Sequence, residues 1–108
     1  MKKYKVLIDP QAKKDLKDIS MYAATNDSIS SVDKLLDGLE KTCYKLKEYP
    51  ERGHIPQELR LTGIKRYLEI HYKVYRIIYE IEKRLIYIHA VLDGRRNIQE
   101  ILAERLLR

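Results

Sequence analysis

The sequence predicts an α+β fold in which a helical hairpin packs on one face of a small, twisted, antiparallel-rich sheet. A short apolar run near the start is typical of a strand, and two stretches with apolar residues at helical spacing follow it. Three alternating runs, separated by very short gaps, predict an antiparallel meander, and a last helical stretch closes the chain. The predicted order is β-α-α-β-β-β-α, and the length suits a single domain over residues 1–108.

The first half of the chain begins with residues 4–8, YKVLI, a β-branched apolar run that predicts a strand. Asp9 and Pro10 are suited to the cap and first turn of a helix that we expect to reach about residue 25. One face of this helix carries the apolar residues Ala12, Leu16, Ile19 and Ala23.

A second helix is predicted after the break NDSISS, with Ser30 and Asp33 as its capping pair. Gly38 lies within it, and we expect this glycine to let the partner helix approach closely. The short break predicts an antiparallel hairpin. The apolar face of the second helix carries Val32, Leu35, Leu36, Leu39, Cys43 and Leu46.

The three runs of the meander are residues 64–70, 72–81 and 84–92. Two-residue turns at His71-Tyr72 and Glu82-Lys83 would place Tyr67 and His89 on either side of Arg76. We expect this row on the sheet face away from the hairpin, open to solvent, with Lys65, Glu69 and Tyr87 beside it. The last helix is expected to begin after DGRRN and to present Ile98, Ile101, Leu102, Arg105 and Leu106 on one side.

Composition and charge limit the classes of partner and site that this chain can have. The net charge of +6 favours a polyanionic partner, either nucleic acid or an acidic protein segment. A single cysteine, Cys43, excludes a disulfide framework and a thiolate metal site, and its helical position predicts a core residue. No segment has membrane-spanning length, and we expect a cytoplasmic protein. His54, His71 and His89 show no paired ligand spacing, so neither a metal nor another cofactor is expected.

The predicted row of Tyr67, Arg76 and His89 has two interpretations. A guanidinium beside an imidazole and phenols is suited to holding a phosphate and moving a proton. A solvated arginine over tyrosine rings is also an ordinary surface arrangement.

Several sequence segments, taken in order, resemble the RelE/ParE superfamily of toxins from bacterial type II toxin–antitoxin modules. They are AKKDLKDI (12–19), LKEYPERG (46–53), the YRIIY of the middle meander strand, and the terminal run GRR…IL…RL. The resemblance covers nearly the whole chain. It implies the same β-α-α-β-β-β-α fold and an acidic antitoxin partner lying along the helical hairpin, with Leu16, Ile19 and Leu39 as expected contacts.

The superfamily resemblance implies one of two mechanisms. One branch cuts mRNA in the ribosomal A site, without a metal. By its pattern Arg76 and Arg95, with Arg96 as an alternative to Arg95, would bind the scissile phosphate. Many cutting members carry a tyrosine or histidine near the C-terminus where this chain has Ile101 and Leu102, so His89 or Tyr67 would have to transfer the proton. The expected RNA-binding residues are Lys65, Arg66, Tyr67, Tyr87 and Arg96. Some cutting members carry a loop glutamate as base, and here the matched position is Gln57, with Glu58 beside it. The other branch poisons DNA gyrase and is not a nuclease.

Three hypotheses therefore follow from the sequence. The chain is a ribosome-dependent mRNA endonuclease, a gyrase poison, or a basic nucleic-acid-binding domain without toxicity. The expected partners are an acidic antitoxin and either the ribosome with its mRNA or DNA gyrase.

Overall fold

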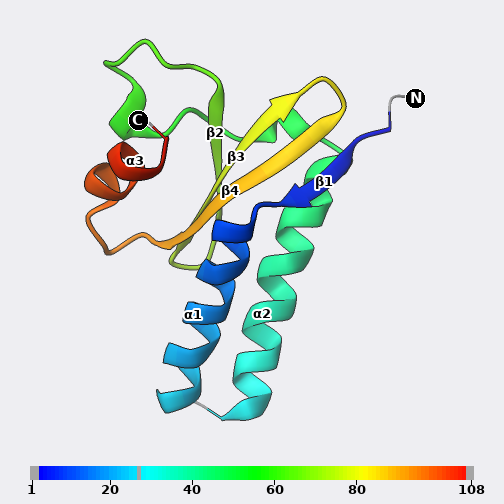
Figure 1. Ribbon diagram of the computed structural model, residues 1–108. Coiled ribbons are helices and arrows are strands. Elements are labelled where there is room, and N and C mark those ends of the chain that lie inside the picture. The colour runs from blue at the N-terminus through cyan, green and yellow to red at the C-terminus, as the bar shows by residue number, and fades with distance from the viewer. Residues whose placement is uncertain (1–2, 27, 107–108) are drawn as a thin grey trace.

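The computed structural model describes residues 3–26 and 28–106, and it confirms the predicted α+β fold and order of elements (Figure 1). The helices and strands are β1 (Lys5–Ile8), α1 (Pro10–Asn26), α2 (Ile29–Tyr44), β2 (Tyr67–Tyr72), β3 (Tyr75–Glu82), β4 (Leu85–Asp93) and α3 (Ile98–Leu106). Three short 3₁₀ turns, at Lys45–Lys47, Pro50–Arg52 and Gln57–Leu59, lie between α2 and β2. No helix within the described residues is long and apolar enough to cross a membrane.

The sheet has four strands in the order β1-β4-β3-β2. β1 runs parallel to β4, whereas β4, β3 and β2 form the predicted antiparallel meander. The first strand of the chain therefore lies beside the last.

Helices α1 and α2 run side by side across one face of the sheet, and their far ends extend beyond it (Figure 1). The apolar face of each helix meets the inward residues of the strands, as the helical spacing predicts. The fully buried residues of this main core include Ala12, Leu39, Cys43, Leu46, Ile77, Tyr79, Ile86 and Ile88.

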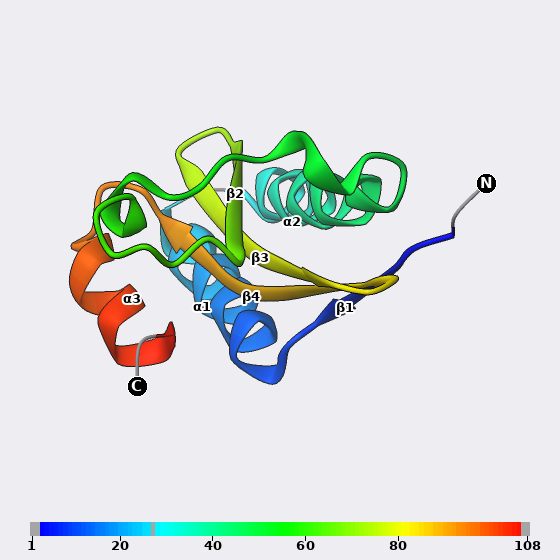
Figure 2. The ribbon, with the colours of Figure 1, turned by 90° about the horizontal axis from the view of Figure 1, so that it is seen from above.

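The opposite face of the sheet is covered, so the expectation of an open face is wrong. The loop from Ile55 to Ile64 and helix α3 pack on it, and both views place α3 beside this loop (Figures 1 and 2). They cover a second apolar cluster of Leu59, Tyr67, Ile78, Ala90, Leu92, Ile98 and Leu102. The isoleucines of β3 thus face apolar layers on both sides.

The predicted register of the meander is also wrong. The two-residue turns are Lys73-Val74 and Lys83-Arg84. The lysine that begins each turn has a positive φ, 53° at Lys73 and 58° at Lys83. Arg76 therefore pairs with His71 on β2 and with Leu92 on β4. The pairing of β3 with β4 shifts between Ile78, opposite Ala90, and Tyr79, opposite Ile88, which leaves His89 as the extra residue of a β-bulge.

Two details of α2 differ from prediction. Its N-cap is Ser28, whose hydroxyl accepts a hydrogen bond from the backbone N–H of Ser31 at 3.2 Å, so the helix begins earlier than Ser30. Gly38 makes room for the phenol of Tyr72 on β2, because a Cβ at this position would overlap it. The close approach is that of a strand side chain and not of the partner helix.

Candidate functional site

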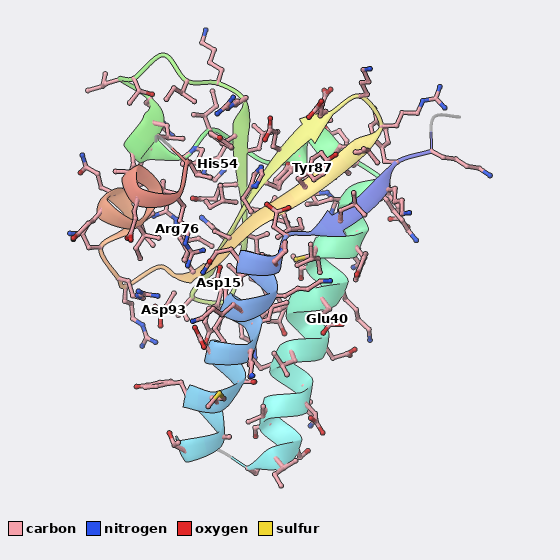
Figure 3. All side chains as sticks on the ribbon, viewed as in Figure 1. Asp15, Glu40, His54, Arg76, Tyr87 and Asp93 are labelled. Carbon is pink, nitrogen blue, oxygen red and sulfur yellow. The ribbon has the colours of Figure 1, made fainter. Side chains whose placement is uncertain are left out.

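Arg76 projects from β3 on the face away from the helical hairpin, as predicted, but it is enclosed there. Its two terminal nitrogens donate to both carboxylate oxygens of Glu58, at 2.8 and 2.7 Å. Its Nε donates to Oε1 of Glu69 at 2.7 Å. The side chain is only 13% exposed, so the guanidinium is bound on two sides by carboxylates of its own chain. Figure 3 labels Arg76 at the covered side of the sheet.

Glu58 reaches Arg76 from the short 3₁₀ turn Gln57–Leu59, which is anchored by the buried Leu59. The hydrogen bond from Arg76 lowers the pKa of the Glu58 carboxyl below its usual value. In return the Glu58 and Glu69 carboxylates raise the pKa of Arg76. Each group therefore stabilises the charged form of the other.

Glu69 on β2 is 3% exposed and uses both carboxylate oxygens. Oε1 accepts from Arg76, and Oε2 lies 2.6 Å from Nε2 of His71 and 3.3 Å from Nε2 of His54. The rings of the two histidines meet edge to face, with centroids 5.5 Å apart. The fold therefore brings together two histidines that the sequence separates by a loop.

His89 lies in a different place from Arg76, and the prediction that the two are neighbours is wrong. Its Nδ1 lies 2.6 Å from Oδ2 of Asp9, and its Nε2 lies 2.8 Å from Oε1 of Glu80. Glu80 is four residues from Arg76 along β3, about 13 Å of strand. The cause is the register, which sets Leu92 opposite Arg76.

The two tyrosines predicted to bind RNA do lie next to His89. Tyr67 meets the imidazole edge to face at 5.6 Å, and Tyr87 stacks on it at 6.3 Å between centroids. Tyr67 is only 4% exposed, however, so its ring has no open face for a base. Lys65 and Arg66 are exposed just before β2, and the Arg66 guanidinium lies 4.8 Å from the centre of the Tyr67 ring.

Arg95 and Arg96 lie on the exposed turn between β4 and α3. This turn begins close to Arg76, because a Cβ on Gly94 would lie 3.4 Å from the Cδ of Arg76. Arg95 donates to both oxygens of Asp93, at 2.9 and 2.6 Å, and it remains 70% exposed. This pairing lowers the pKa of Asp93 and raises that of Arg95. Arg96 is exposed and lines hollows on both sides of the turn, near Asp9 and near Tyr75.

Of the three residues expected to contact an antitoxin, Leu16 and Leu39 are buried in the main core. Both side chains are covered by their own fold, and their contact with an antitoxin stays a prediction. Ile19 is half-buried and lines a hollow of about 340 Å³ with Tyr22 and Tyr75. The large apolar side chains exposed on the hairpin are instead Met21, Tyr22, Ile29 and Tyr44.

The sequence placed Glu69 beside Arg76, and the structure confirms this contact, but the pairing of Arg76 with Glu58 was missed. Glu58 is in a loop, and loop position is fixed by tertiary contacts such as the hydrogen bonds from Tyr79 to Pro50 and from Gly53 to Tyr79. The alternation of β2 was the available signal for Glu69, because it sets that residue on the same face as Arg76 and His71. The arrangement therefore consists of Arg76, whose charge is balanced by Glu58, and of the Glu69 carboxylate with two partly exposed imidazoles beside it.

We compared the chain with known protein families, curated proteins and solved structures. Residues 6–98 match the family model described as the ParE toxin of the type II toxin–antitoxin system, parDE. A search of curated proteins found no match.

Two solved structures have a similar fold. A chain of the chromosomal ParDE toxin–antitoxin system from P. aeruginosa superposes with a TM-score of 0.67 at 11% identity, covering 82% of this chain and 92% of that one. A chain of the toxin–antitoxin complex RelBE2 from Mycobacterium tuberculosis gives 0.59 at 18% identity, covering 82% and 95%. Since the family model spans most of the sequence, this chain belongs to the ParE toxin family of type II toxin–antitoxin systems.

Proposed function

We propose that this toxin arrests growth by poisoning DNA gyrase and does not cut RNA. The observation that carries the proposal is the enclosure of Arg76, which the nuclease mechanism needs as its phosphate ligand. Three of its nitrogens already donate to carboxylates, and the side chain is 13% exposed.

A substrate phosphate would have to displace Glu58 and approach Glu69. This displacement would break two hydrogen bonds between Glu58 and Arg76 and leave the Glu58 carboxylate without its guanidinium partner. The incoming phosphate would also meet two negative carboxylates in a site shielded from water, where like charges repel strongly. In addition, His89 is held at another place on the sheet, between Asp9 and Glu80. The arrangement therefore disfavours phosphate chemistry at Arg76.

A binding inhibitor needs an exposed surface and no catalytic set. The turn between β4 and α3 supplies two exposed arginines, Arg95, which pairs with Asp93, and Arg96. The net charge of +6 supports attraction to an enzyme–DNA complex, because DNA is a polyanion. Within this proposal the toxin domain spans residues 1–108 and acts in the cytoplasm.

We also infer that the toxin binds an acidic antitoxin segment along the helical hairpin. Met21, Tyr22 and Ile29 are exposed near the end of the hairpin that extends beyond the sheet (Figure 1). An amphipathic segment would cover these apolar side chains, while its acidic residues would meet the lysines of the hairpin.

The experiment pairs two assays on the same untagged toxin, freed from antitoxin. In the first, gyrase, ATP and plasmid are incubated with toxin, and gyrase-linked double-strand breaks are measured. In the second, a translation extract with one mRNA is probed by primer extension. The proposal expects DNA breaks and intact mRNA, whereas new ribosomal A-site cuts with unaffected gyrase would establish the nuclease mechanism. Activity in neither assay would favour a nucleic-acid-binding domain without toxicity.

A matched double variant sharpens the result. Arg76→Gln with Glu58→Gln removes one positive and one negative charge and leaves the net charge unchanged. If gyrase poisoning is the mechanism, the folded double variant keeps its full effect on gyrase. A loss of more than about tenfold, with circular dichroism unchanged, would show that Arg76 takes part and would count against the proposal.

A further inference from the structure

We propose that His54, Glu69 and His71 form a binding site for a divalent transition-metal ion of the zinc type. The site is independent of how the toxin acts on its target. The three residues each offer one ligand atom, and these atoms all lie within 4.8 Å of one another.

One of the ligand distances already matches a tetrahedral site. With metal–ligand bonds of about 2.0–2.1 Å, neighbouring ligand atoms lie about 3.3 Å apart. Nε2 of His54 is 3.3 Å from Oε2 of Glu69, and Nε2 of His71 is 2.6 Å from the same oxygen. Both imidazoles are about half exposed, so their rings have room to turn, and His71 would have to move away from Glu69 to reach this spacing.

The backbone under the site is fixed, although His54 lies in a loop. The N–H of His54 donates to the carbonyl of Glu69 at 3.1 Å, and the N–H of Glu69 donates back at 2.7 Å. Glu69 and His71 are two residues apart on β2, so their side chains leave the strand on the same face. The preceding Gly53 is held by the phenol of Tyr79 at 3.0 Å. All three ligands therefore start from positioned backbone, as a preorganised metal site requires.

A second layer of contacts orients the carboxylate. Arg76 binds Oε1 of Glu69 and leaves Oε2 to face the two histidines. Glu58 compensates the charge of Arg76 through its two hydrogen bonds. Because Glu58 and Arg76 compensate each other, Glu69 supplies the negative ligand, and the cations Lys45 and Arg52 line the same hollow. Outer partners of this kind commonly set the affinity of a metal site.

The donor set indicates which ion is bound. Two imidazole nitrogens and one carboxylate oxygen suit zinc, copper or nickel, whereas calcium and magnesium prefer oxygen ligands alone. Three protein ligands leave a fourth position open, as in catalytic zinc sites. That position faces a shallow hollow of about 450 Å³ lined by Thr42, Lys45, Arg52, His54, Glu69, Ile70 and His71. Water fits there as the fourth ligand.

The alternative is a hydrogen-bonded cluster without a metal, in which a protonated histidine pairs with Glu69. The two alternatives differ in an experiment with metal-free, untagged toxin. Zinc is titrated against a chromophoric chelator, and the number of sites and the dissociation constant are measured. The proposal expects one site per chain.

Three histidine variants identify the ligands. His54→Gln and His71→Gln should each weaken zinc binding by at least about tenfold. His89→Gln is the matched control, since the sequence has three histidines and this one is held elsewhere by Asp9 and Glu80. Absence of saturable binding, or equal affinity in the His54→Gln/His71→Gln double variant and the unmodified toxin, would overturn the proposal.

A second measurement uses the unmodified chain and so does not depend on the folding of variants. Cobalt(II) replaces zinc at His-rich sites and broadens the NMR signals of nearby protons. The imidazole signals of His54 and His71 should broaden at one equivalent, while those of His89 stay sharp. Equal broadening of all three signals, or none, would contradict the assignment.

Discussion

The guanidinium of Arg105 donates to both carboxylate oxygens of Asp15, each at 2.7 Å, and thereby joins the last helix to the first. Asp15 is buried, and its Oδ2 also accepts the backbone N–H of Val91 on β4 at 3.0 Å. The pairing raises the pKa of Arg105. One carboxylate thus holds α1, α3 and the central strand β4 together, and Figure 3 labels it at the start of α1 beside the sheet.

Replacing Arg105 with methionine should lower the free energy of unfolding by about 3 kcal/mol. Methionine keeps the length of the side chain, but the buried Asp15 loses its partner, and breaking such a pair costs roughly 3–5 kcal/mol. The measurement is urea denaturation followed by circular dichroism. Lys14→Met is the control, because Lys14 forms an exposed pair with Asp18 at 2.9 Å that should contribute less than about 1 kcal/mol. Equal losses of unfolding free energy in the two variants would show that the Arg105–Asp15 pair stabilises the fold no more than an exposed pair does.

Tyr79→Phe should lower the free energy of unfolding by about 1–3 kcal/mol. The buried phenol donates to the carbonyl of Pro50 at 2.6 Å and accepts from the N–H of Gly53 at 3.0 Å, and phenylalanine leaves both groups without this partner. Tyr44→Phe, on an exposed phenol, is the control and should change stability by less than about 0.5 kcal/mol. Thermal and urea unfolding of both variants test the difference, and an unchanged Tyr79→Phe protein would refute it.

Acid should destabilise the toxin partly through Glu58. Arg76 lowers the pKa of Glu58 in the folded state below the usual 4.5. A lowered carboxyl pKa stabilises the fold above the unfolded value, and this contribution is lost as the pH falls through the folded value. We therefore expect unfolding free energies, measured between pH 7 and pH 3, to fall more steeply for the unmodified toxin than for Glu58→Gln below about pH 4.5. Glu48→Gln, an exposed carboxylate, should keep the original slope. Identical pH profiles for the unmodified toxin and Glu58→Gln would show that Glu58 does not contribute to the loss of stability in acid.

Cys43 should resist thiol reagents in the folded toxin. It is fully buried in the main core, and burial raises its pKa to about 12, so very little reactive thiolate is present at pH 8. Reaction with a disulfide reagent is followed by absorbance, in buffer and in 6 M urea. Labelling in buffer should follow the rate of unfolding, whereas complete labelling within the mixing time would show that the core opens readily.

The elements of this fold were predictable because each has a strong local pattern. The apolar face of α2, from Val32 to Cys43, repeats at helical spacing, and the strands alternate or are continuously apolar. The register was not predictable from these patterns. Both hairpin turns place a lysine, Lys73 or Lys83, at positive φ, where Asn or Gly is the usual signal, and a β-bulge at His89 shifts the pairing again.

The candidate site was likewise predictable only where local sequence patterns determine it. The facing of Arg76 and its neighbour Glu69 followed from the alternation of β3 and β2, but the pairing with Glu58 depends on a loop between Pro50 and Ile64. That loop has little secondary structure of its own and is positioned by contacts far apart in the sequence, such as Gly53 with Tyr79. Two histidines with no recognisable ligand spacing meet for the same reason.

The position of β1 has a consequence for synthesis of the toxin. β1 pairs in parallel with β4, and Lys5 lies opposite Leu85 in that register. β1 therefore cannot form its strand pairing until β4, about eighty residues later in the chain, has been translated. The nascent chain cannot complete its sheet until β4 has left the ribosome, so a product terminated before β4 has neither the complete sheet nor the helix that covers its second face.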